Sequence, residues 1–271
     1  MKWGLFTSGY QRNPLEDAFR DAKRFGYDFV ELWGGRPHAY APDLAAGELD
    51  AVRRLVERYE MPVLVYTPEH NAYPYNFMLG SEAMRRDAVA YLKLGLDMAK
   101  ALGAGSMLMS PAHAGYLATR EQIRERLVHT MGELVEHAER VGVRIILEAL
   151  TPYESNVCTS ANDLAELFRL VPSENLVGMC DLVPPFVQSE SIMAYFDKLG
   201  PKMAHLHIVD STGDSDTHLV PGEGRLPLRE LLAELRELPY EGTATLELVT
   251  AYLNEPRLYA RRAIEAVKAL R

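Results

Sequence analysis

Short apolar runs alternate with longer amphipathic segments from one end of the chain to the other. The segment 84–102 illustrates the second kind, because its apolar residues recur at spacings of three and four, the period of a helix with one buried face. The apolar runs between such segments have the length of strands. Eight strands are predicted in this way, at 3–7, 29–34, 62–68, 105–111, 144–150, 177–182, 203–210 and 243–249.

Eight strand-then-helix units predict an α/β fold of the (β/α)8 type, a TIM barrel. Such a barrel needs roughly 250 residues, so the chain fits it as one domain over residues 1–271. An open doubly wound sheet is the alternative. The G-x-G-x-x-G pattern of a dinucleotide site does not follow the first strand, which weakens that alternative. We therefore expect the closed barrel.

Polar residues stand near the ends of the later strands and share one phase of the strand period. In such barrels the chemistry lies on inward side chains at the C-terminal strand ends, and strand side chains alternate with period two. Glu148 follows Ile146 in the inward phase of the fifth strand. The next three strands carry polar residues at matching positions: Asp181, His207 and Glu247. These four side chains are expected to converge on one mouth of the barrel.

Three buried carboxylates without a cation would repel one another, and the loss of solvation would cost roughly several kcal/mol for each group. A divalent metal ion is the simplest way to balance them. Three oxygen donors and one imidazole suit Mn²⁺, Co²⁺ or Ni²⁺, and also Mg²⁺, better than metals that prefer thiolates. Taken singly, each residue could instead be a solvated loop-end acid or a hydrogen-bonded core histidine; the four together favour a site.

The positions of Glu148 and Glu247 also indicate a reaction. They lie three strands apart, with the expected metal between them. If a 2-ketose chelates the metal through its carbonyl and adjacent hydroxyl, the neighbouring C–H becomes acidic and an enediolate is stabilised. One glutamate can remove the proton from one face while the other returns a proton to the opposite face, which gives epimerisation. An isomerase would need only one face.

Composition narrows the classes of partner. The net charge of −9 is unfavourable for a nucleic acid as partner, because phosphate binding depends on Lys and Arg. No apolar run reaches the roughly 18 to 20 residues that span a bilayer, so no membrane partner is expected. The first residues, MKWGLF, lack a signal-peptide pattern, and two cysteines do not suggest a disulfide framework. We expect a cytoplasmic protein with a small-molecule substrate.

Six stretches of the sequence carry a resemblance to a known family. They are VELWGGRPHAYAPDL (30–44), YTPEHNAYPYNFMLG (66–80), AHAGYL (112–117), LEALTPYESNV (147–157), HLHIVDSTGDSDTHLVPGEG (205–224) and ELVTAYLNEPRLYARRA (247–263). These stretches extend over nearly the whole chain. They resemble the xylose-isomerase-like barrel superfamily of sugar epimerases, and within it the ketosamine 3-epimerases most of all.

The resemblance implies a reversible C3 epimerisation between fructoselysine and psicoselysine, ketosamines that carry lysine through its ε-nitrogen. It also implies one divalent metal ion held by the four strand-end residues Glu148, Asp181, His207 and Glu247. Glu148 and Glu247 would in addition be the acid/base pair.

Two positions depart from the related 3-epimerases of free ketoses such as tagatose and psicose. Those enzymes carry a His three residues after the metal-binding Asp, where this chain has Pro184, and an Arg six residues after the metal-binding His, where it has Gly213. Glu154, six residues after Glu148, is retained and is expected to contact substrate. The missing His and Arg contact substrate in that subfamily, so a different substrate held by different residues is the natural inference.

The loop after the seventh strand carries two further candidates. Asp216 and His218 should lie over the barrel mouth and are expected to contact substrate, although a loop histidine is often only a surface residue. His205, deeper in the same strand phase as His207, is better explained as a hydrogen-bonded residue of the barrel interior. Trp33, inward-facing at the end of the second strand, could stack on the sugar or plug the barrel.

His70 and His113 follow the third and fourth strands and are also expected to contact substrate. They resemble positions that hold extra zinc ions in the AP-endonuclease branch of the superfamily, and Asp216-Thr217-His218 resembles the Asp-x-His of that branch. A nuclease is therefore the strongest rival, but Pro184 replaces a histidine that the branch also needs, and the net charge is unfavourable for DNA.

The lysyl tail needs carboxylates near its cation and a donor for its own carboxylate. Four candidates are left unranked: Glu31, Arg36, Glu69 and Asp216. The segment with Tyr73, Tyr75 and Asn76 is either a lid or a packed loop. Cys158 and Cys180 are expected to be structural, and Met107 and Met109 to belong to the core.

Several functions stay open at this point. Epimerisation of free ketoses, aldose–ketose isomerisation and dehydration of a cyclic ketose all use related metal sites. A barrel that binds a sugar without catalysis would hold no metal tightly, and Glu148→Gln or Glu247→Gln would change only its affinity. The native metal and the oligomeric state, including a homo-oligomer, are not settled by the sequence.

Overall fold

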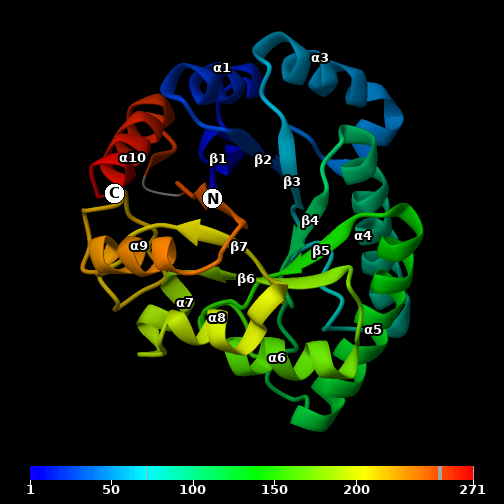
Figure 1. Ribbon diagram of the computed structural model, residues 1–271. Coiled ribbons are helices and arrows are strands. Elements are labelled where there is room, and N and C mark those ends of the chain that lie inside the picture. The colour runs from blue at the N-terminus through cyan, green and yellow to red at the C-terminus, as the bar shows by residue number, and fades with distance from the viewer. Residues whose placement is uncertain (72, 250–251, 271) are drawn as a thin grey trace.

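The computed structural model describes residues 1–71, 73–249 and 252–270. The other four residues are 72, 250–251 and 271, and three of them fall inside stretches that carry the resemblance, 66–80 and 247–263. Within the described chain, strands occupy the middle of the molecule and helices surround them (Figure 1).

Eight strands form a closed barrel in which each strand is parallel to its neighbours and their order follows the sequence. The barrel closes where β1 pairs with β8, with Lys2 opposite Thr243. The predicted TIM barrel is confirmed. The strands are β1 (Lys2–Phe6), β2 (Phe29–Gly34), β3 (Val63–Pro68), β4 (Ser106–Met109), β5 (Arg144–Leu147), β6 (Leu176–Asp181), β7 (Met203–Ile208) and β8 (Thr243–Leu246).

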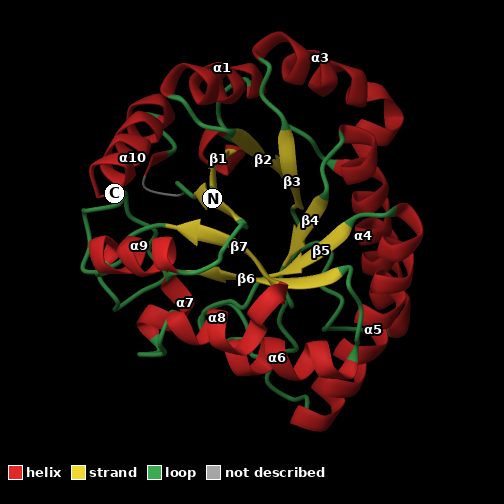
Figure 2. Ribbon diagram, in the orientation of Figure 1, coloured by secondary structure: helices red, strands yellow, loops and turns green. Residues whose placement is uncertain are grey.

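Helices lie around the outside of this barrel, as the colouring by element type makes clear (Figure 2). The α-helices are α1 (Leu15–Phe25), α2 (Ala41–Asp43), α3 (Leu49–Tyr59), α4 (Glu82–Leu102), α5 (Arg120–Val141), α6 (Ala161–Leu170), α7 (Val183–Val187), α8 (Met193–Leu199), α9 (Leu228–Glu237) and α10 (Pro256–Leu270). Shorter turns of other helix types are η1 (Thr7–Tyr10), η2 (Leu44–Glu48) and η3 (Gly200–Lys202). In the described part of the chain, none of the helices combines the length and the apolar character needed to cross a membrane.

The two longest helices begin and end at residues that satisfy their free backbone groups. The Ser81 hydroxyl accepts a hydrogen bond from the backbone of Met84 at the start of α4. Thr119 and Gln122 cap each other's backbone at the start of α5. Both helices end at a glycine in the left-handed region, Gly103 for α4 and Gly142 for α5, where a side chain would be strained.

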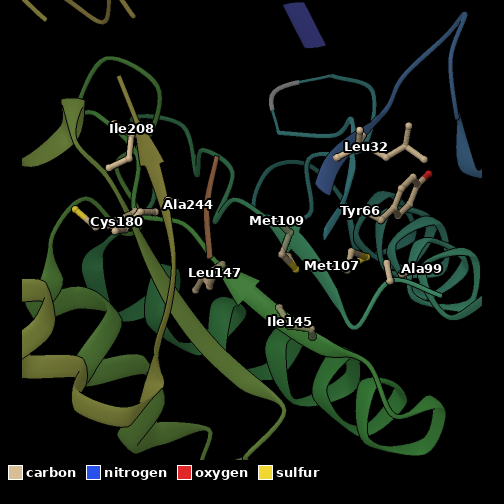
Figure 3. Packing of buried hydrophobic residues seen from close by; sticks show 14 of the residues in the cluster. Leu32, Tyr66, Ala99, Met107, Met109, Ile145, Leu147, Cys180, Ile208 and Ala244 are labelled. Atoms are coloured by element: carbon tan, nitrogen blue, oxygen red, sulfur yellow. The ribbon is translucent and has the colours of Figure 1, made fainter. Parts of the chain in front are cut away.

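The core has two layers, which correspond to the two faces of the strands. The barrel interior contains a small apolar cluster: Phe29, Val65, Leu108, Ile146, Val177 and Met179. A larger cluster fills the space between barrel and helices and includes Ile145 and Leu147, together with Met107 and Met109 (Figure 3). The alternation along β5, with Ile146 inward and its neighbours outward, is as predicted.

Cys158 and Cys180 are both buried and free. Each is about 1% exposed, and Cys180 lies in the outer core layer (Figure 3). Burial raises the pKa of both thiols well above the ordinary value. They are therefore inert packing residues in the folded chain, as the sequence indicated.

Six of the eight strands end earlier than predicted, and β5 and β8 differ most. β5 stops at Leu147 and β8 at Leu246, whereas the apolar pattern extended both by three residues. Glu148 and Glu247 are therefore the first residues beyond their strands. The backbone N–H of Glu148 still donates to the carbonyl of Met109 at 3.0 Å, so the barrel fixes its direction.

Candidate active site

The four strand-end residues come together around one nitrogen atom. His207 lies in β7 and Asp181 is the last residue of β6. The Nδ1 atom of His207 is 2.9 Å from Glu247 Oε2, 3.4 Å from Glu148 Oε1 and 3.6 Å from Asp181 Oδ2. Inward phase at consecutive strand ends was sufficient to predict this convergence.

Two observations indicate that the cluster could bind a divalent cation. His207 Nδ1 and Asp181 Oδ2 are buried and have no hydrogen-bond partner, which is costly unless something else binds them. Glu148, Asp181 and His207 also offer one donor atom each within a sphere that a metal ion can occupy, and Asp181 and Glu247 belong to an adjoining group with His218. Carboxylate oxygens with one imidazole nitrogen are ligands that hard and borderline divalent ions accept.

The two glutamates differ in their electrostatic setting. Burial raises the pKa of Glu148 to about 7, and Glu247 and Asp181 add to this while His207 opposes it. Burial also acts to raise the pKa of Glu247, but His207 and His218 outweigh it and hold that pKa well below the ordinary value. One carboxyl group can therefore carry a proton near neutral pH while the other is ionised.

His218 lies against the cluster from the loop after β7. Its Nδ1 atom is 3.2 Å from Glu247 Oε2, and its Nε2 atom is 3.9 Å from both Asp181 and Asp216. Burial would lower the pKa of His218, but Asp181 and Glu247 raise it to about 10. The loop histidine is thus part of the site and not an ordinary surface residue.

Glu154 and Asp216 add two carboxyl groups at the mouth. Burial raises the pKa of Glu154 to about 8, and Asp216 and Glu148 contribute to this shift. Burial likewise raises the pKa of Asp216. The Thr151 hydroxyl donates to Glu154 at 3.1 Å. Both groups are therefore crowded carboxyls for which a cationic partner would be favourable.

A cavity of about 260 Å³ opens onto Glu154 and onto three of the four strand-end residues. Residues from several strand ends line it, among them Trp33, His70, Glu148, Glu154, His207 and Glu247. A larger hollow of about 710 Å³ lies against α5 and α6 and contains none of the four strand-end residues. The chemistry of the lining, and not its size, identifies the smaller cavity as the site.

Trp33 and His70 stand on the wall of this cavity. The half-buried Trp33 donates from Nε1 to Glu69 at 2.7 Å, so its ring faces the cavity edge and does not plug the barrel. His70 is buried, and its Nε2 atom accepts from the backbone N–H of Ser110 at 3.2 Å. Burial lowers the pKa of His70 to about 4, which keeps the ring neutral.

His113 is placed differently from the prediction. Its Nδ1 atom accepts from the backbone N–H of Gly115, and its ring packs edge-on against Tyr116. It is not among the described residues that line the cavity. A position just beyond a strand is therefore not sufficient to bring a side chain to the mouth, because the loop turns His113 onto its own backbone.

Two of the four candidates for the lysyl tail, Glu31 and Arg36, are not among the described residues that line the cavity, and Glu69 lies on its wall. Glu31 is completely buried below the site and bonds His205 and His207. Arg36 forms two 2.6 Å hydrogen bonds with Asp43, and Glu69 accepts from Trp33. Glu69 lines the cavity and Asp216 lies beside Glu154 and His218, so these two candidates are left near the mouth.

Two other expectations can be compared with the structure. His205 is a hydrogen-bonded interior residue, with Nδ1 at 2.7 Å from Thr243 Oγ1. The segment after β3 is packed: the Tyr75 ring stacks on Tyr91 at 3.8 Å between centroids, and Asn76 donates to the carbonyl of His113. The packed-loop alternative therefore holds for Tyr75 and Asn76, whereas Tyr73 is 83% exposed.

Gly213, one of the two departures from the free-ketose enzymes, has a structural basis. Gly213 has φ of 83°, and a Cβ atom there would lie 2.9 Å from the ring of Phe186. Phe186 belongs to α7, the short helix that contains Pro184. An arginine at position 213 would be strained and would displace this ring, so the mouth of this chain is built without that cation.

The family described as xylose isomerase-like TIM barrel matches residues 19–270. The chain is 56% identical over 270 residues to the fructoselysine 3-epimerases of Shigella flexneri and Escherichia coli O157:H7, covering 100% of this chain and 98% of each relative.

Solved structures share the fold. A 3-keto-D-glucoside 4-epimerase from E. coli has a TM-score of 0.83 at 17% identity over 99% of both chains. A D-psicose 3-epimerase from Clostridium cellulolyticum H10 has a TM-score of 0.81 at 18% identity over 99% of this chain and 98% of that one. The chain therefore belongs to the xylose isomerase-like TIM barrel family, in the branch that contains the fructoselysine 3-epimerases, and is an isomerase-class enzyme of the epimerase type.

Proposed function

We propose that the chain is a metal-dependent 3-epimerase that interconverts fructoselysine and psicoselysine. The observation that carries this is the pair Glu148 and Glu247, which reach the same His207 nitrogen from strands three apart in barrel order. The 56% identity to fructoselysine 3-epimerases supports the choice of substrate.

Glu148, Asp181, His207 and Glu247 would hold one divalent cation, with Mn²⁺, Co²⁺ or Ni²⁺ favoured and Mg²⁺ acceptable. When bound, the cation supplies positive charge to the oxygens of the ketose and so makes the neighbouring C3–H more acidic. The unpartnered His207 Nδ1 and Asp181 Oδ2 atoms support such a role for the cluster.

The protein's own groups move the protons. An ionised glutamate accepts the C3 proton on one face of the sugar, and a protonated glutamate gives a proton to the other face. Both carboxylates lie close to His207 Nδ1, Glu247 at 2.9 Å and Glu148 at 3.4 Å, which supports a shared role for the pair. The roles exchange in the reverse direction, because each step must be reversible.

The charge of the mouth favours a ketosamine over a neutral ketose. Glu154 and Asp216 stand beside the three carboxylates of the metal cluster, and the described residues that line the cavity include neither lysine nor arginine. Fructoselysine carries a secondary ammonium group at C1, next to the reacting carbons. A carboxylate at the mouth would stabilise that group, whereas free fructose has no charge to offer.

The test is solvent exchange at C3, followed by proton NMR of the Mn²⁺-loaded protein with fructoselysine in D2O. We expect deuterium at C3 together with psicoselysine, and slower exchange with free fructose. Glu148→Gln and Glu247→Gln should each reduce exchange by at least about a hundredfold. Glu121→Gln, on the exposed first turn of α5, is the matched control and should not change the rate.

Exchange with free fructose but not with fructoselysine would keep the epimerase and overturn the substrate. Absence of exchange with every ketose would overturn the proposed function and favour the dehydratase, nuclease or binding-protein alternatives.

A further inference from the structure

A layer of polar side chains lies inside the barrel directly below the metal-binding cluster. Glu31 on β2, His205 on β7 and Thr245 on β8 are each 0% exposed. The neighbouring interior cluster is wholly apolar, with Phe29 and Val65 among its members. A buried carboxylate in such surroundings is unfavourable unless it is well hydrogen-bonded, so the contacts of Glu31 need an explanation.

The Glu31 carboxylate has three partners. Its Oε1 atom accepts from the Thr67 hydroxyl at 2.7 Å, and its Oε2 atom lies 3.0 Å from His205 Nε2. His207 Nε2 lies 3.3 Å from Oε1 and 3.2 Å from Oε2. The carboxylate therefore sits against the Nε2 edge of the same imidazole whose Nδ1 atom faces the metal-binding cluster.

This contact decides which nitrogen of His207 is free. An ionised carboxylate can only accept, so the hydrogen bond requires a proton on Nε2. In the neutral ring the lone pair is then on Nδ1, the atom that lies closest to Glu247 and has no hydrogen-bond partner. A cation bound among the three carboxylates needs that lone pair, whereas a neutral ring with its proton on Nδ1 would offer none and would leave Glu31 without a donor from His207.

Other residues hold Glu31 in place independently of His207. Thr67 donates to one oxygen, and His205 bonds the other. His205 is itself anchored, because its Nδ1 atom lies 2.7 Å from Thr243 Oγ1 and its Nε2 atom 3.2 Å from Thr245 Oγ1. Glu31, His205 and His207 could in principle hold a cation of their own, but their facing atoms are already paired with one another.

We propose that Glu31 is a positioning residue for the metal centre: it fixes the tautomer and the ring orientation of His207, so that Nδ1 is presented to the cation. The inference rests on the metal site of the proposed function, and Glu31 itself touches neither the substrate nor the metal. Carboxylate partners of this kind make an imidazole a stronger ligand, and their removal commonly costs 10- to 100-fold in metal affinity.

The experiment is calorimetric titration of the metal-free protein with Mn²⁺. Glu31→Gln keeps the shape of the side chain and removes its charge, and should raise the Kd for Mn²⁺ by about 10- to 100-fold. Long-range ¹H–¹⁵N NMR of the Zn²⁺-loaded protein supplies a second readout. The wild type should have a proton on His207 Nε2 and the metal on Nδ1, and this pattern should change or broaden in the variant.

Asp21→Asn is the matched control. Asp21 is also 0% exposed and bonds Tyr10 and Arg257 away from the site, so its loss should lower stability without changing the Kd. If Glu31→Gln does not fold, Thr67→Val removes only one hydrogen bond to Glu31 and should raise the Kd by about two- to tenfold.

An unchanged Kd in Glu31→Gln, or an equal increase in Asp21→Asn, overturns the positioning role. These results leave the proposed function intact if the wild type binds Mn²⁺ and exchanges the C3 proton. A wild type that binds no divalent cation overturns both together.

Discussion

Asp216 is the mouth residue whose charge can be removed with the least disturbance. It lies in the loop after β7, about 30% exposed at its side chain, and it shares a crowded carboxyl environment with Glu154. Its neighbour Asp214 is on the same loop but exposed to solvent. Variants of Asp216 and Asp214 can therefore distinguish a direct contact with the substrate from a general effect of charge on the loop.

We expect Asp216→Asn to raise KM for fructoselysine about tenfold while kcat changes little, because a carboxylate contact with an ammonium group contributes on the order of 1.5 kcal/mol. Free fructose should be unaffected, since it carries no cation. Steady-state kinetics on both sugars make the comparison, with Asp214→Asn as control. An equal loss on both sugars would mean that Asp216 shapes the loop and does not select the substrate.

Residues differ in how far the sequence could place them. Glu148 and Glu247 were predictable because strand period and strand end together define a direction and a level in the barrel. Glu31 shares the inward phase of β2, yet the sequence offers it only as one of four unranked candidates for the lysyl tail, because phase does not tell how deep a side chain lies. His113 lies off the cavity because its loop turns it back on the N–H of Gly115, which the sequence does not indicate.

At the scale of elements, the loop that follows β7 depends on one buried carboxylate. Asp210 Oδ1 accepts from the backbone N–H groups of Ser211 and Leu226, and Oδ2 accepts from that of Gly222. A Cβ atom at Gly224 would lie 2.3 Å from Asp210 Oδ1. The Pro-Gly-Glu-Gly segment therefore closes the loop because it can approach this carboxylate.

Asp210→Asn should lower the free energy of unfolding by about 1 to 3 kcal/mol, because an amide NH2 group would then face a backbone N–H donor. Activity should fall as well, since the same loop carries Asp216 and His218. Urea unfolding and C3 exchange measure the two effects, and Gly132→Ala on α5, where a Cβ meets open space, is a control outside the loop. Normal stability with lost activity would contradict this structural role.

The elements themselves followed from periodicity, since all eight predicted strands and the long helix at 84–102 are present. The ends of β2 and β3 followed as well, but the other six strand ends did not. The apolar pattern continues past Leu147 because Ala149 and Leu150 are buried in the turn that follows, and burial alone does not distinguish the last ladder residue from the first loop residue. The site stands at this transition.

At the scale of the whole molecule, the carboxylates that would bind the metal lower the stability of the metal-free fold. Glu148 has a folded pKa of about 7, above its ordinary 4.5. The unfolded chain therefore releases this proton first as the pH rises. In the metal-free protein, the protonated Glu148 side chain contributes fully to the free energy of unfolding below pH 4.5. This contribution is lost as the pH rises through 7.

Glu148→Gln should thus be more stable than the wild type at pH 8 in the presence of a chelator, by on the order of 2 kcal/mol, and about equal at pH 4.5. With Mn²⁺ the order should reverse, because the variant lacks a ligand and gains less from binding. Thermal unfolding at both pH values, with and without the metal, gives the four comparisons. A variant that is less stable than the wild type at pH 8 with chelator would exclude electrostatic crowding in the cluster.

Chemical labelling of the buried Cys180 thiol can report how often the barrel opens. Cys180 is next to Asp181 in β6, and a water-borne alkylating reagent reaches it only when this strand separates from its helical cover. The rate at which Cys180 is labelled therefore measures how often β6, the strand that carries the proposed metal ligand Asp181, opens. A ligand bound to Asp181 would make these openings rarer and slow the labelling of Cys180. Occupancy of the metal-binding cluster can therefore be followed without a substrate or a spectroscopically active metal.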